Sequence, residues 1–182
     1  MRIYSSALVA SLFGALTLSA CNPAQNWRDV AFEGSALKVQ LPCKPDRTAR
    51  SVPLGGVPVE LQVVGCESGT AMFAVMSAAL PAGSDASAVM AAWQKATLDN
   101  ARVPQPLVAG QQQAWHRPGQ LPLATSLRVQ APGLRANGEP VSMDAVWGAL
   151  SEGERVRLVH AVVYDRKIAV ELSSTLFESI QP

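Results

Sequence analysis

The feature that most limits how this chain folds is a pair of alternating segments, residues 141–150 and 155–164. In the first, apolar residues recur at every second position, the period of a β-strand. They are Val141, Met143, Ala145 and Trp147. The second is apolar on both sides, so it belongs in the middle of a sheet that is covered on both faces. One side carries Val156, Leu158, His160 and Val162, and the other carries Val159, Ala161 and Val163. The turn at residues 151–154 makes the two segments antiparallel partners.

Four earlier segments show strand character and are separated by turn residues, which predicts an antiparallel meander. These segments are residues 36–41, 47–54, 57–66 and 70–80. The pair Gly55-Gly56 indicates a hairpin turn, because glycine reaches positive φ without steric cost. In this meander Cys43 and Cys66 end the first and third strands.

Two helices are predicted to pack on this sheet. The first spans residues 86–102 without Gly or Pro; Ser84 or Asp85 caps its start, and Arg102 suits its negative end. Apolar residues at helical spacing should face the sheet. They are Val89, Trp93 and Ala96. The second helix covers residues 168–180 near the end of the chain.

The middle of the chain is harder to assign. Residues 107–119 fit either a strand or a surface loop, whereas residues 121–130 read as a strand and Asn137-Gly138 as a turn within residues 132–140. The order of elements predicts an α+β fold, an antiparallel sheet packed by helices in a single domain.

The N-terminal segment predicts export from the cytoplasm. Arg2 precedes an apolar run over residues 7–18, the pattern of a secretory signal. Residues 18–21 read Leu-Ser-Ala-Cys, and this motif resembles the lipobox of bacterial lipoproteins. The resemblance implies a signal peptide at residues 1–20, cleaved just before Cys21.

In that family the cysteine thiol carries a diacylglycerol, so Cys21 would bear acyl chains such as palmitate and anchor the protein in a membrane. Residues 21–26 would be a tether and residues 27–182 a domain facing the periplasm of the cell envelope. Asn22 at the second mature position favours the outer membrane over the inner. A plain secretory signal with an incidental cysteine and an N-terminal membrane helix are the alternatives; the apolar run is short for a span.

Removal of residues 1–20 would leave 162 of the 182 residues, enough for one domain. Because Arg2 leaves with the signal, the 15 basic side chains become 14 and balance the 14 acidic ones. A neutral chain without a basic stripe argues against a nucleic-acid partner. Attachment to a membrane would rest on the lipid alone.

If Cys21 is acylated, Cys43 and Cys66 are the remaining cysteines, and an oxidising periplasm favours a disulfide between them. A redox or metal site is the alternative, but the Cys-x-x-Cys spacing and nearby ligands are missing from the sequence.

Residues 32–42, followed by Pro45, form a proline-ended strand that resembles the opening strand of the PsbP/Mog1-like α/β/α sandwich proteins. Residues 176–180 resemble their final helix, and the order of elements is similar over most of residues 32–180. The resemblance implies a sheet with helices on its faces. For bacterial members it implies a small domain of unassigned role.

The sequence singles out no catalytic residue, cofactor, metal site or ligand-binding residue. His116 is expected to be exposed and His160 to lie in the core, while Glu139 and Asp144 read as solvated charges. Four methionines are core filler rather than copper ligands. They are Met72, Met76, Met90 and Met143. Two tryptophans fit the core, Trp93 and Trp147; two others either mark a contact surface or pack against loops, Trp27 and Trp115.

Three hypotheses for function remain. The first is a non-catalytic lipoprotein that binds an envelope protein partner or supports envelope assembly. The second is a carrier of a small ligand between sheet and helix, which an apolar cavity lined by Met72, Trp93 or Trp147 would favour. An enzyme has the weakest support in the sequence.

Overall fold

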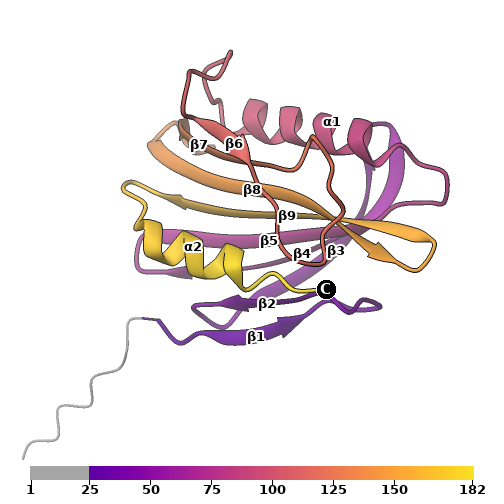
Figure 1. Cartoon of the computed structure of the whole chain (residues 1–182). Helices are drawn as coiled ribbons and strands as arrows, with labels where there is room; N and C mark the ends of the chain where they lie inside the picture. Colours follow the sequence, from indigo (N-terminus) through magenta and orange to yellow (C-terminus); the bar gives the residue numbers. More distant parts are fainter. Residues whose placement is uncertain (1–24) are drawn as a thin grey trace, which may run out of the picture.

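The computed structural model describes residues 25–182, so residues 1–20 and Cys21 lie outside the described part of the chain. An antiparallel sheet dominates it, with the strand order β3-β4-β5-β9-β8-β7-β6 (Figure 1). Its strands are β3 (Asp46–Leu54), β4 (Val57–Ser68), β5 (Ala71–Ala79), β6 (Gln112–Ala114), β7 (Leu127–Leu134), β8 (Pro140–Glu152) and β9 (Arg155–Asp165). A separate two-stranded sheet contains β1 (Arg28–Ala31) and β2 (Lys38–Leu41), and the helices are α1 (Ala86–Asn100) and α2 (Val170–Glu178). The fold is therefore α+β, as predicted.

The strand with two apolar faces, β9, lies at the centre of the large sheet between β5 and β8. It pairs antiparallel with β8 from Glu152↔Arg155 to Ser142↔Asp165, which confirms the predicted hairpin. Its two faces lead into two different cores. The face with Leu158 and Val162 packs under α1, and the face with Val159 and Val163 packs under α2 and the β1–β2 sheet.

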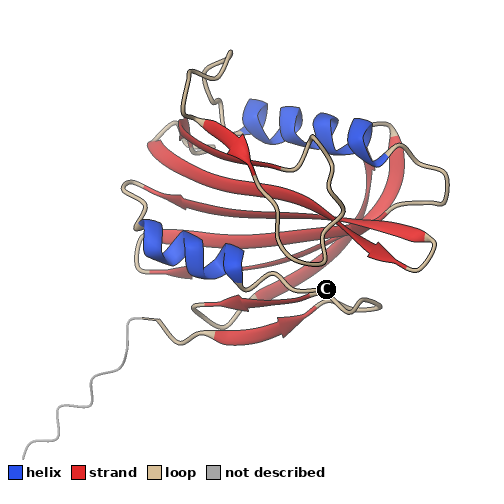
Figure 2. Ribbon diagram, in the orientation of Figure 1, coloured by secondary structure: helices blue, strands red, loops and turns tan. Residues whose placement is uncertain are grey.

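Three layers result, with α1 on one face of the sheet and α2 with the β1–β2 sheet on the other (Figure 2). α1 crosses its face diagonally. In the N-terminal half of the helix, a Cβ added to Gly55 in the β3–β4 turn would lie 3.0 Å from Cβ of Ala92 and 3.2 Å from Cα of Val89. Just beyond the helix C-terminus, the Ala101 carbonyl accepts a hydrogen bond from the backbone N–H of Leu134 in β7, at 2.7 Å. Gly133 permits this approach, because a Cβ there would lie 2.6 Å from the same carbonyl.

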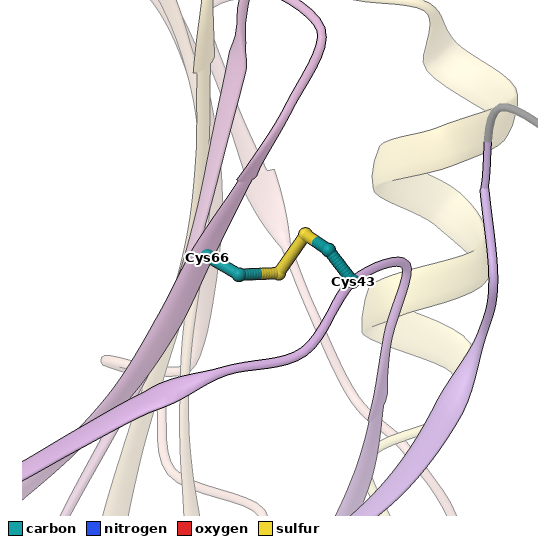
Figure 3. Close-up of a disulfide and its surroundings, with 2 residues drawn as sticks. All are labelled: Cys43 and Cys66. Carbon is teal, nitrogen blue, oxygen red and sulfur yellow. A yellow bond between two sulfur atoms is a disulfide. The ribbon is translucent and has the colours of Figure 1, made fainter.

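A disulfide joins Cys43, in the loop after β2, to Cys66 in β4, with Cα atoms 5.9 Å apart (Figure 3). The predicted pairing is confirmed, but its setting differs from the expected one. β2 belongs to the small sheet rather than to the meander, and its partner β1 was not predicted as a strand. The bond therefore ties the second layer to the large sheet instead of joining two strand ends within one sheet.

The strand predicted at residues 121–130 is wrong in position. β7 begins at Leu127, and Leu121 and Leu123 belong to a loop that packs on the α1 core. β7 instead continues through Pro132 and Gly133, which lie in the segment predicted to contain a turn. The edge position of this part of β7 explains how it accommodates proline, because β6 pairs only as far as Val129 and no strand requires the missing N–H.

Both helices are shorter than predicted. Asp85 caps α1 by accepting a hydrogen bond from the backbone N–H of Ala88, but the helix ends at Asn100 and Arg102 lies beyond it with φ of 49°. Val89 and Trp93 are buried as expected, whereas Ala96 is exposed. The ambiguous segment before β7 contains one short strand, β6.

Removal of the disulfide should destabilise the attachment of the second layer. Cys43 and Cys66 are 23 residues apart, and the chain-entropy model gives about 3 kcal/mol for a loop of that size. We expect the double variant Cys43→Ala/Cys66→Ala to lose about that much free energy of unfolding in urea titrations. Equal stability of this variant and the oxidised parent would contradict the prediction.

Candidate functional site

One corner of the sheet face beneath α1 is not covered by the helix. Strand β5 shows the difference between its two faces, because Phe73 and Val75 on the α2 side are fully buried. Met72, Ala74 and Met76 on the α1 side are only half-buried. The diagonal path of α1 explains the asymmetry. Its C-terminus lies over β7, so the helix leaves the start of β3, the end of β4 and the start of β5 uncovered.

Two clefts open at this corner, and both are lined by Met72. One has a volume of about 590 Å³, and the half-buried residues Val63, Gly65 and Ala74 lie along it. The other has a volume of about 420 Å³ and is bounded by Val141, Tyr164 and the β7–β8 turn. We call the two clefts together the Met72 groove, formed by Val63, Gly65, Met72, Ala74, Val141 and Tyr164.

The groove has an apolar floor and a charged rim. Lys44 lies along its rim with Asp46 and Glu67, so the rim carries both signs of charge. The Arg47 guanidinium points to the other face of the sheet, where it donates to the Ala31 carbonyl of β1. Burial raises the pKa of Tyr164 further above physiological pH, so the phenol is neutral there and acts only through its hydroxyl and ring. An apolar floor with polar groups at its margin suits a ligand that has an apolar body and a polar end.

His160 is a core residue, as predicted. Its ring stacks on Trp147 with centroids 4.4 Å apart and meets Trp93 edge to face. Complete burial lowers the pKa of His160 to about 4, while its Nδ1 lies 3.0 Å from the Val146 carbonyl. The ring is therefore neutral at pH 7. His116 is exposed, also as predicted.

Asp144 is not a solvated charge, so that prediction is wrong. Its side chain is only 1% exposed and receives two hydrogen bonds from the Arg128 guanidinium, at 2.8 and 2.6 Å. The Ser173 hydroxyl of α2 donates a third bond at 2.7 Å, and the Gln130 amide donates a fourth at 3.0 Å. An acid within an otherwise apolar strand was the available sequence signal, because such a group needs partners when buried. Glu139, in contrast, is exposed as expected.

Asp144 and His160 lie on opposite faces of the sheet. On β8, Asp144 points toward α2, whereas Trp147, the register partner of His160, points toward α1. The sheet therefore separates Asp144 from His160, and the Ser173 hydroxyl beside Asp144 has no histidine partner.

A second charged pair joins the turn of the β8–β9 hairpin to the loop between β1 and β2. Arg157 donates to Glu152 at 2.7 Å and to the Ser77 hydroxyl at 3.1 Å, and Ser35 donates to the same Glu152 oxygen. Burial by itself would raise the pKa of Glu152, but the hydrogen bonds from Arg157 and Ser35 outweigh it and lower that pKa.

The methionines and tryptophans divide by position. Met90 and Met143 are core residues, as are Trp93 and Trp147. Met76 is half-buried and packs against the α1 core, whereas Met72 lines the groove and departs from the core-filler prediction. Trp27 and Trp115 are both half-buried. Trp27 meets Phe73 edge to face, and Trp115 covers Gly148.

Within residues 25–182, no group of His, Cys, Asp and Glu side chains is arranged to hold a metal ion. None of the helices in this part of the chain is long and apolar enough to cross a membrane. No family model, curated protein or solved structure matches the chain. The Met72 groove is therefore the candidate site on its geometry.

Breaking the Asp144 cluster should be costly. Asp144→Ala leaves Arg128 and Ser173 without their shared acceptor, and loss of one partner of a buried pair costs about 3–5 kcal/mol. We expect that loss in urea unfolding, with Glu139→Ala as the exposed control within about 0.5 kcal/mol of the parent. Equal losses in the two variants would show that the cluster does not hold α2 on the sheet.

Proposed function

We propose that this protein is an envelope lipoprotein that acts by binding rather than by catalysis, and that it holds an apolar ligand in the Met72 groove. The observation that supports this most directly is the contrast across β5. Its α2 face is fully buried, whereas Met72 and Ala74 on the α1 face line open clefts. An apolar cavity lined by Met72, Trp93 or Trp147 was expected to favour a small-ligand carrier, and the clefts lined by Met72 support that proposal.

The placement of the polar groups supports a non-catalytic role. Asp144, Arg128 and Ser173 bond to one another within the α2 layer, and His160 is buried on the other side of the sheet. A nucleophile needs a base within hydrogen-bond reach, and the serine of this cluster contacts an acid that is already paired with arginine.

We further propose that the chain is anchored through lipid on Cys21 and faces the periplasm. The lipobox-like residues 18–21 support the anchor, and Asn22 favours the outer membrane over the inner. The three-layer arrangement and the proline after β2 support membership of the PsbP/Mog1-like α/β/α sandwich group.

An envelope protein partner is the second candidate function, and strand β3 favours it. β3 is an outer strand of the large sheet, and residues 46–51 are all exposed. An edge of this kind can accept an extended segment of another chain through backbone hydrogen bonds. Arg47, Arg50 and Pro53 reduce unspecific pairing along it.

The binding proposal is tested with the apolar fluorophore N-phenyl-1-naphthylamine and a chain of residues 22–182. We expect saturable fluorescence enhancement with the parent. In Met72→Glu the affinity for the fluorophore should fall about tenfold, because an unpaired carboxylate would lie on the apolar floor. The control is Val170→Glu on α2, where the apolar side chain is 53% exposed and outside the groove. Equal binding by both variants would exclude the Met72 groove as the site.

The anchoring proposal is tested by intact mass and membrane fractionation of the full chain. The parent should carry a diacylglycerol on Cys21 and sediment with membranes, whereas Cys21→Ala should appear in the soluble fraction or remain unprocessed. A variant that fractionates and migrates like the parent would refute the anchor.

A further inference from the structure

We infer that the ligand of the Met72 groove is an acyl chain of a phospholipid from the same bilayer that holds the Cys21 anchor. This inference rests on the proposed function, and it adds the chemical class of the ligand and the direction from which it enters. Its basis is the place where the tether joins the domain, compared with the place where the groove opens.

The tether joins the domain at the end of the sheet that carries the groove. The backbone N–H of Asn26 donates to the Pro42 carbonyl at 2.8 Å, one residue before Cys43. The Trp27 ring lies 6.5 Å from that of Phe73, which follows Met72 in β5 and points to the α2 face. The tether and the groove therefore share one end of the sheet but lie on its opposite faces. In Figure 1 the indigo start of the described chain lies at the left end, together with the β4–β5 turn.

The tether is short compared with the domain. Five residue steps separate Cys21 from Asn26, and an extended chain covers at most about 3.6 Å per residue, or about 18 Å in all. The 13 residues of β8 extend about 43 Å at 3.3 Å per residue. Anchored through Cys21, the domain therefore keeps the groove end close to the bilayer.

This closeness favours lipid over a folded partner as the occupant. A small domain is about 30 Å across, wider than the longest gap that the tether allows at this end. A phospholipid needs no such space, because it already lies in the facing surface. The protein-partner edge β3 begins at this end with Asp46 and extends away from it to Leu54, so only its first residues line the groove.

The chemistry of the groove fits a phospholipid at both ends of the molecule. Val63, Met72 and Ala74 offer an apolar floor to the acyl chain. Lys44 on the rim can pair with a headgroup phosphate, and Asp46 and Glu67 with the amine of phosphatidylethanolamine. The mixed rim therefore matches a headgroup that carries both charges.

The test uses the full acylated chain in vesicles of phosphatidylethanolamine and phosphatidylglycerol, with a trace of phospholipid bearing a photoreactive diazirine at the acyl end. After illumination, mass spectrometry should place the adducts on β5 around Met72 and on β9 near Tyr164. We expect Met72→Glu to reduce them about tenfold. Ala74→Phe, which fills the groove without adding charge, should reduce them as well, and Val170→Glu should not.

A second arm tests the tether. A flexible Gly/Ser spacer of about 20 residues between Gln25 and Asn26 adds a mean reach of about 25 Å. It should lower adduct yield severalfold while fluorophore binding stays unchanged. Adducts equal in parent and groove variants, or a yield unaffected by the spacer, would overturn the lipid inference. If the fluorophore still binds in the groove, the proposed binding function survives that result; if the groove variants leave fluorophore binding unchanged, the proposed function fails as well.

Discussion

The structure depends on a single strand that is apolar on both faces. β9 cannot lie at an edge or beside water, because Leu158 and Val162 point one way and Val159 and Val163 the other. Two covering layers follow from this requirement. α1 supplies one of them, and α2 together with the β1–β2 sheet supplies the other, so the three-layer arrangement is a consequence of burial around one central strand.

The two layers are attached in different ways. α1 packs mainly through apolar contacts, with Trp93 and Met90 in its core. The opposite layer contains short elements, and it is fixed by more specific bonds: the Cys43–Cys66 disulfide holds the β1–β2 sheet, and Asp144 links Arg128 of β7 to Ser173 of α2. Such bonds suit a layer whose short pieces bury little surface individually.

The same packing creates the candidate site. A single straight helix of 15 residues cannot cover a curved seven-stranded sheet, and the diagonal path of α1 leaves one corner open. The corner lies at the end where the chain enters the domain. An anchored protein would therefore present its least covered apolar surface toward the membrane, which links the proposed anchor to the proposed ligand.

Local patterns in the sequence predicted the hairpin of β8 and β9 and the start of α1 after a cap at Ser84 or Asp85, and the cysteine count predicted the pairing of Cys43 with Cys66. Alternation and capping involve residues that are close in the chain, so they can be recognised without knowledge of the tertiary structure. Only tertiary structure decided that β1–β2 forms its own sheet, that Asp144 is buried, and that Met72 lines a groove. A charged residue or a methionine has the same local sequence pattern whether its side chain is buried or exposed, because burial depends on elements that are distant in sequence.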